Sequence, residues 1–172
     1  MFTIPKGEGI KKIMDYYNEM RLVGHLVLAA FLGALIGLER ERRVGLAGIR
    51  THAAVALGAC LFGFISMNVS QPSFPNTMTG TADPSRIAAQ IVSGIGFLGA
   101  GVILRDRGRV RGLTTAATVW ATASIGLAVA NKMYLLAICA TVIILSILSL
   151  YRFPGWMKWK EKTRRRAYDE DD

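Results

Sequence analysis

Hydrophobic residues are gathered into five long blocks, and the charged residues lie between them. An α-helix rises about 1.5 Å per residue, so a block of about 18 apolar residues nearly crosses a hydrocarbon core of about 30 Å. Backbone N–H and C=O groups find no water in that core, which favours helices. The pattern predicts an all-α, polytopic membrane bundle of five transmembrane helices, with these spans: 22–38, 51–69, 87–104, 113–130 and 133–150.

The flanking segments differ from the five-helix transmembrane domain, which covers residues 22–150. In residues 1–21, Ile10, Ile13 and Tyr17 share a helical stripe, which predicts an amphipathic segment at the membrane interface. A frayed polar leader is the alternative. Residues 151–172 are basic and then acidic, and we expect them to form a cytoplasmic tail whose Trp156 and Trp159 lie in the interfacial aromatic belt.

The basic residues alternate between loops, which predicts the orientation. The loops after the first and third blocks hold four Arg each, and seven Lys or Arg follow the fifth block. The loop after the second block has no Lys or Arg before Arg86, and the turn after the fourth has only Lys132. Because cytoplasmic loops are enriched in Lys and Arg, we expect a multi-pass protein of the bacterial cytoplasmic (inner) membrane, with its N-terminus outside and its C-terminus cytoplasmic.

Charge and composition narrow the function classes. The net charge is +9, from 21 Lys and Arg against 12 Asp and Glu. The basic residues cluster at block ends, which favours lipid headgroups over nucleic acid as the partner. Cys60 and Cys139 both lie inside hydrophobic blocks, as small packing residues do. No nucleophile with its base and no phosphate-binding loop is present, so we expect neither an enzyme nor an organic cofactor.

Glycines recur at helical spacing. Residues 94–99 match G-x-G-x-x-G, but they sit in the middle of a span, whereas a dinucleotide site needs a preceding strand. Small residues instead let membrane helices approach closely. An alternative is a helix that unwinds to offer carbonyls to an ion. We predict these helix-packing positions: Gly33, Gly37, Gly94, Gly96, Gly99 and Gly101.

Polar residues near the span ends are the candidates for an ion site. At the outer end of the third span, Asp83, Arg86 and Gln90 form either a polar site or a cap with a snorkelling Arg. Asp83 is also the expected N-cap, with Pro84 as the first helical residue. Asp83 and Glu39 are weak candidates for binding Mg²⁺, which prefers carboxylate oxygens.

Two further polar groups are expected nearer the cytoplasm. Glu39, Arg50 and Thr51 form either an ion-pair cluster at the cytoplasmic mouth or a solvated loop, and the adjacent His52 is a hydrogen-bonding residue rather than a metal ligand. The fourth span carries hydroxyls that either line a hydrophilic path or bond back to their own helix. These are Thr114, Thr115 and Thr118, continued by Thr122.

Four stretches together resemble the MgtC/SapB family of membrane proteins: 33–41, 47–52, 83–104 and 110–120. The resemblance implies a five-helix bacterial inner-membrane domain linked to magnesium homeostasis, acid tolerance and virulence. Many members add a cytoplasmic domain after the fifth span, and we expect this chain to be a short form that lacks it.

The resemblance implies two functions of different classes. The first is a magnesium-related transporter of Mg²⁺ or another cation, which five spans would perform best as a homodimer. The alternative is a regulatory module that contacts a larger membrane complex, such as the rotary ATP synthase. The partners expected are the lipid bilayer, a second copy and such a complex.

Overall fold

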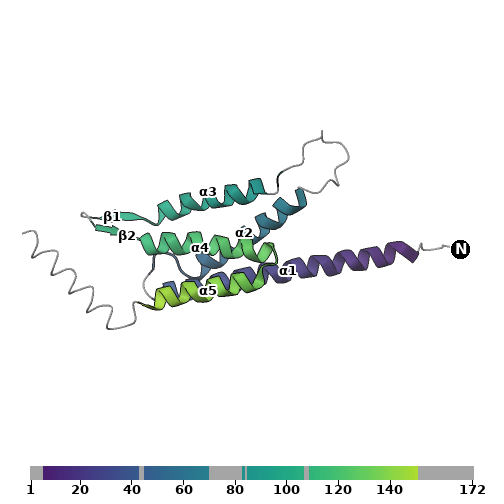
Figure 1. The fold of residues 1–172 in the computed structure, drawn as a ribbon, viewed down its shortest axis with the longest axis horizontal. Helices are drawn as coiled ribbons and strands as arrows, with labels where there is room; N and C mark the ends of the chain where they lie inside the picture. Colours follow the sequence, from purple (N-terminus) through teal and green to yellow (C-terminus); the bar gives the residue numbers. More distant parts are fainter. Residues whose placement is uncertain (1–5, 43–44, 70–82, 84, 107–108, 151–172) are drawn as a thin grey trace, which may run out of the picture.

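The computed structural model describes residues 6–42, 45–69, 83, 85–106 and 109–150. Over these residues the chain is mostly helical, as predicted, with five helices and one small hairpin (Figure 1). The elements are α1 (Lys6–Glu41), α2 (Ile49–Val69), α3 (Ser85–Gly101), β1 (Leu104–Asp106), β2 (Arg109–Arg111), α4 (Leu113–Ala130) and α5 (Tyr134–Ser149). The predicted tail, with Trp156 and Trp159, lies outside the described residues.

Among the described residues, three helical segments are long and apolar enough to cross a membrane: Glu19–Glu41, Ile49–Met67 and Leu113–Ala130. The other two apolar helices, α3 and α5, have 17 and 16 residues. At 1.5 Å per residue they reach roughly 25 Å, which is less than a typical hydrocarbon core. The count of five spans and the orientation therefore stay predictions.

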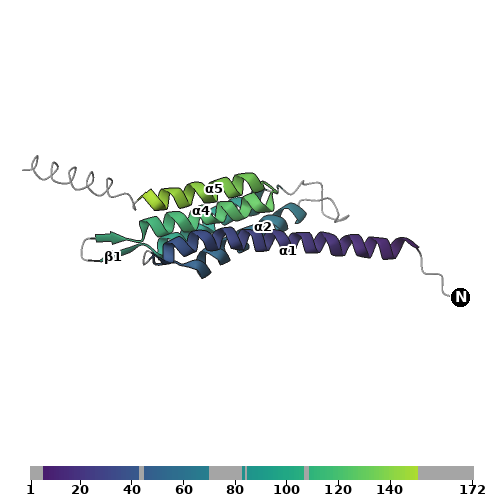
Figure 2. The same ribbon diagram turned by 90° about the horizontal axis from the view of Figure 1, so that it is seen from below.

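The first helix does not break at the boundary expected near residue 21. α1 is one helix of 36 residues, and its N-terminal part extends beyond the other helices (Figures 1 and 2). Between residues 10 and 23 the sequence has no Gly or Pro that would end a helix. Tyr17 and Met20 are exposed there. Residues 6–21 therefore begin the first long helix, and their place at the interface stays a prediction.

A β-hairpin replaces the end of the predicted third span, so the described chain is not purely helical. α3 ends at Gly101, and β1 pairs antiparallel with β2, with Leu104 opposite Arg111 and Asp106 opposite Arg109. Only two residues, the second of them Gly108, separate the strands. A two-residue connection containing Gly is a typical hairpin signal, so the sequence carried this information.

The core lies where α1, α2 and α4 meet. Ala29, Ile36, Ala56, Ile125 and Val129 are buried in one cluster. α2 contacts both α1 and α4, whereas α3 packs on α4 and α2, and α5 packs on α1 and α4. The outward faces are apolar, as a surface bathed in lipid requires, and they expose these large side chains among others: Phe31, Phe97, Leu135, Ile143 and Ile147.

Glycines set how closely the core helices approach. A Cβ on Gly33 would lie 2.5 Å from the His52 carbonyl oxygen and 2.8 Å from the Ala56 Cβ. A Cβ on Gly37 would lie 2.6 Å from the Ile49 Cα. On α4, Gly126 faces the Ala56 carbonyl from the other side. α2 is therefore held between α1 and α4 at distances that only hydrogen atoms on the glycines permit.

We expect Gly33→Ala to destabilise the protein by about 1–3 kcal/mol, because the new methyl group must displace the backbone of α2. The matched control is Gly24→Ala on the same helix, where a Cβ would meet nothing within 4 Å. Alanine is the better helix former, so this control should be neutral or slightly stabilising. Denaturant unfolding in detergent, followed by helical circular dichroism, measures both variants. Equal stability of the two would contradict the close α1–α2 packing.

Candidate functional site

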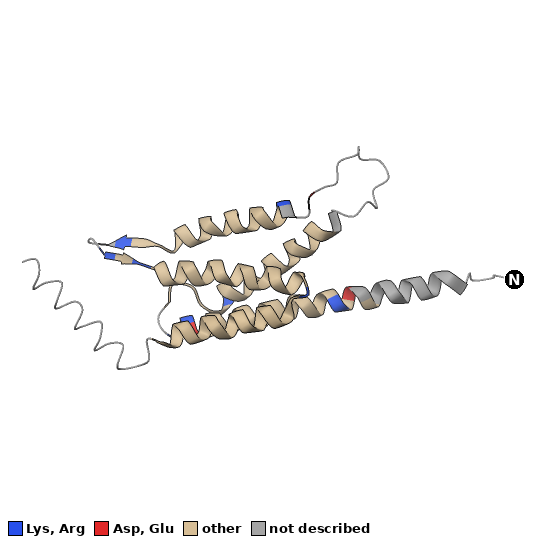
Figure 3. Cartoon of the chain, in the orientation of Figure 1, with Lys and Arg blue, Asp and Glu red and all other residues tan. Residues whose placement is uncertain are grey.

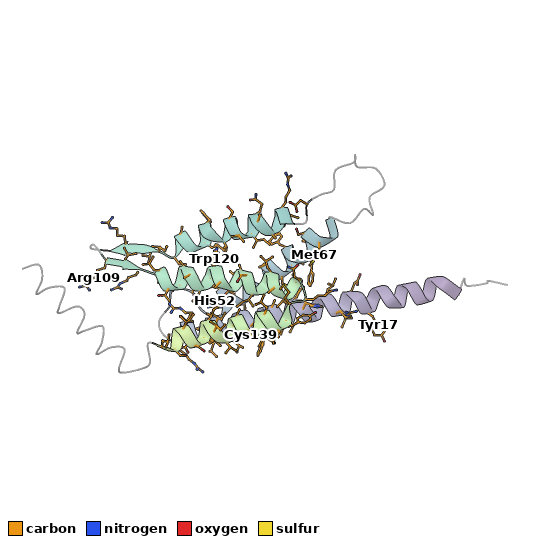
Figure 4. All side chains as sticks on the ribbon, viewed as in Figure 1. Tyr17, His52, Met67, Arg109, Trp120 and Cys139 are labelled. Atoms are coloured by element: carbon orange, nitrogen blue, oxygen red, sulfur yellow. The ribbon has the colours of Figure 1, made fainter. Side chains whose placement is uncertain are left out.

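Buried polar side chains gather where the last turn of α1, the first turns of α2 and the first turns of α4 meet. His52 is 0% exposed and Thr115, Thr118 and Thr122 are between 0% and 5% exposed. In Figure 4, His52 lies among the helices rather than on the outer surface. Polar groups in such a position need hydrogen-bond partners inside the protein.

His52 joins α2 to α4. Its Nδ1 lies 2.9 Å from the Gly48 carbonyl oxygen, so Nδ1–H is the donor there. Its Nε2 lies 3.2 Å from the Thr118 hydroxyl oxygen. The Thr118 hydroxyl also donates to the Thr115 carbonyl oxygen over 2.9 Å, so its single hydrogen goes either to that carbonyl or to Nε2 of the neutral imidazole. The expected role of His52 as a hydrogen-bonding residue fits this geometry.

The last turn of α1 is tied to both neighbours. Arg40 Nη2 donates to the Thr115 hydroxyl oxygen over 2.9 Å, which links α1 to α4. Glu41 Oε2 accepts a hydrogen bond of 3.0 Å from the Ile49 backbone N–H, one of the first-turn donors of α2. Neither residue was a predicted site residue. Arg40 lies three positions and Glu41 four positions after Gly37, so the three residues share one face of α1. That spacing was the available signal.

The predicted mouth residues are placed differently from their neighbours. Arg50 and Thr51 are exposed, and Glu39 is half-buried. Arg40 and His52, which neighbour these residues in the sequence, bond to threonines of α4, whereas Glu41 is itself exposed and bonds to the start of α2.

The threonines of α4 also include both exposed and buried residues. Thr114 is exposed, whereas the Thr115, Thr118 and Thr122 stripe faces the core. The Thr122 hydroxyl donates to the Thr118 carbonyl oxygen over 2.7 Å, and the Thr118 hydroxyl makes the similar bond to Thr115. Of the two alternatives for these threonines, such bonds fit hydroxyls that bond back to their own helix better than hydroxyls that line a hydrophilic path.

At the other end of the molecule, the Arg86 N–H donates to the Asp83 carbonyl oxygen over 3.2 Å. α3 begins at Ser85, and Pro84 lies outside the described residues. Asp83, Arg86 and Gln90 are all exposed. Asp83 precedes α3, whereas Glu39 is in the last turn of α1 at the opposite end, so the two candidate Mg²⁺ ligands are not brought together (Figure 1). Within the described ranges, no group of three His, Cys, Asp or Glu could hold a metal ion.

Gln90 and Thr51 instead line a groove of about 560 Å³ between α2 and α3, with Ala123 of α4 at its base. The rest of its lining is apolar, including Val55, Phe62 and Ile91. Neither Asp83 nor Arg86 nor the buried threonines line it.

The glycines of α3 do not mediate close helix packing as Gly33 and Gly37 of α1 do. Within the part of the chain that the structure describes, a Cβ on Gly94, Gly96 or Gly101 would meet nothing within 4 Å, and one on Gly99 would make an ordinary contact of 3.7 Å with Ala116. One outer face of α3 carries small exposed residues at spacings of four, three and four, which we call the α3 ridge: Ala89, Ser93, Gly96 and Ala100.

Apolar helices of membrane length, packed through glycine, define a helical membrane protein. The model of the MgtC family matches residues 26–154. The chain is 52% identical over 121 residues to Protein MgtC of Salmonella typhimurium (strain LT2), which covers 70% of this chain and 48% of the relative. It is 47% identical over 124 residues to Protein MgtC of Brucella abortus (strain 2308), covering 72% and 48%.

The chain therefore belongs to the MgtC family, as the resemblance predicted. It spans about half the length of these curated relatives. No solved structure matches it.

We expect Thr118→Val to destabilise the protein by about 1–2 kcal/mol, because it keeps the shape but removes the hydroxyl that faces His52. Thr114→Val, on the exposed side of the same helix, is the matched control and should change stability by less than about 0.5 kcal/mol. Thermal unfolding of both variants in the same detergent measures the difference. A Thr118→Val protein as stable as its control would show that the α2–α4 hydrogen bond contributes nothing.

Proposed function

We propose that this chain is a multi-pass protein of the bacterial inner membrane that serves magnesium homeostasis by contacting another membrane protein through the α3 ridge. Membership of the MgtC family supports the link to magnesium. The contact mechanism rests on the uncovered small residues of α3.

The physical argument concerns helix association in lipid. Lipid tails are as apolar as Leu side chains, so membrane helices associate through close packing of small residues rather than through the hydrophobic effect. Glycine inside a helix costs about 1 kcal/mol relative to alanine. In α1, Gly33 and Gly37 permit contact with α2, but a Cβ on Gly96 of the α3 ridge would meet nothing of the described chain within 4 Å. A second transmembrane helix seated on the ridge would use it.

The partner is either a second copy of this chain or a different membrane protein, and the ridge is compatible with both. A homodimer would place two ridges against each other. A larger membrane complex would contribute a helix with small residues of its own. The family resemblance implies the ATP synthase as one such complex.

The charge distribution supports the orientation expected from the sequence, with the N-terminus outside and the C-terminus cytoplasmic. The hairpin, the end of α1 and the start of α2 lie toward one end of the described chain, where most Lys and Arg are drawn (Figure 3). Arg42, Arg50, Arg105, Arg109 and Arg111 are exposed there. The positive-inside rule assigns that end to the cytoplasm.

Cation transport is the second candidate, and the buried cluster of Arg40, His52 and Thr118 favours it, because polar groups within a membrane often mark ion paths. We rank it below the contact function. The threonine hydroxyls of the described cluster bond to carbonyls of their own helix, and the Arg40 guanidinium would repel a cation.

In a strain that lacks the chromosomal copy, we expect wild-type protein to restore growth in low magnesium and Gly96→Leu to fail. Gly96→Leu places a bulky side chain on the ridge, where it would keep a partner helix away. Gly101→Leu is the control on the same helix, because that position is equally open but lies off the ridge. Pull-down in mild detergent with mass spectrometry should recover a membrane partner, or a second copy, with wild type and control only.

Growth and partner recovery that are unchanged in Gly96→Leu would contradict the contact function. Purified protein in liposomes separates the two candidates, since a Mg²⁺ flux through the isolated chain would favour transport. We expect no such flux.

A further inference from the structure

Each wall of the groove between α2 and α3 contains a glycine, Gly58 on α2 and Gly94 on α3. A Cβ on either glycine would meet no atom of the described residues within 4 Å. Its volume of about 560 Å³ falls in the range of roughly 300–1,000 Å³ that small-molecule sites occupy. The groove is therefore large enough for a ligand without any movement of the helices.

The lining selects a hydrocarbon ligand. Apart from Thr51 and Gln90, the residues that face the groove are apolar. A bound water needs two to four polar partners, which most of this surface does not offer. Phe62 and Leu98 on the rim are about half exposed, so the groove opens onto the apolar outer surface. In a membrane that surface faces acyl chains.

The charges near one end of the groove select the headgroup. Thr51, which lines the groove, directly follows the exposed Arg50 at the start of α2. The hairpin at this end of the molecule adds the exposed Arg105, Arg109 and Arg111, and Arg109 is labelled on it in Figure 4. Basic residues beside grooves between membrane helices on the cytoplasmic side bind anionic lipid headgroups, and an Arg guanidinium matches phosphate geometry.

We propose that this groove binds one acyl chain of an anionic phospholipid, with the headgroup phosphate held by Arg50. The lipid lies along the groove, in contact with the Gly58 and Gly94 backbones, and the hairpin arginines add to the positive potential around its headgroup. This inference rests on the bilayer location in the proposed function but not on the α3 ridge. An experiment that disproves the partner contact would therefore not disprove lipid binding in the groove.

Native mass spectrometry of the full chain in mild detergent tests the proposal, with phosphatidylglycerol and phosphatidylcholine of identical acyl chains supplied in equal amounts. We expect wild type to retain one phosphatidylglycerol in preference to phosphatidylcholine. Gly58→Leu fills the groove from α2 and should lower retention of both lipids by about tenfold or more, since each displaced methylene contact weakens binding. Gly94→Leu fills it from α3 and should do the same.

Two further variants separate the tail from the headgroup. Arg50→Gln should retain lipid but lose the preference for phosphatidylglycerol. Gly24→Leu, an equally open glycine on α1 outside the groove, should behave as wild type. Circular dichroism checks that each variant is folded. Undiminished retention in a folded Gly58→Leu or Gly94→Leu protein would overturn the groove as the site, and equal retention of the two lipids by wild type would overturn the anionic headgroup.

Discussion

The fold depends on the close approach of three helix backbones around Ala56. Gly33 of α1 and Gly126 of α4 face this residue from opposite sides, and a methyl group on either glycine would collide with α2. In lipid no hydrophobic force draws helices together, so such contacts carry much of the association. The hydrogen bonds of His52 and Arg40 lie at one end of the same three-helix contact and fix the register in which α1, α2 and α4 meet.

The same constraint divides the molecule into a filled part and an open part. In the filled part, Gly33 and Gly37 of α1 and Gly126 of α4 pack closely against α2. α3 contacts α4 and α2 along one side, but its ridge and its groove-facing glycines remain open. The two proposals assign these open surfaces separately, the ridge to another membrane helix and the groove to a lipid chain. Both proposals rest on glycines around which the described chain leaves open space, namely Gly96 on the ridge and Gly58 and Gly94 in the groove.

Sequence reasoning found the helices because long apolar blocks have few alternatives, and the fourth block, residues 113–130, matches α4 residue for residue. It missed the hairpin, because the apolar character of Val102–Leu104 continues past the end of the helix and hides the strand. It did not name Arg40 and Glu41, which hydrogen-bond to α4 and to the start of α2. Hydropathy shows where a span ends, whereas the side chains that cross to a neighbour depend on helix phase, which here is set by Gly33 and Gly37.

The most direct test of the central claim, that α3 offers its small-residue face to a partner, is site-specific photocrosslinking in native membranes. A photoreactive residue is placed in turn at positions along α3. The account predicts crosslinks to another chain that peak at the ridge positions 89, 93, 96 and 100, and that fall at 95 and 99, which are buried against α4. Crosslinks spread evenly around the helix, or absent from the ridge, would contradict it.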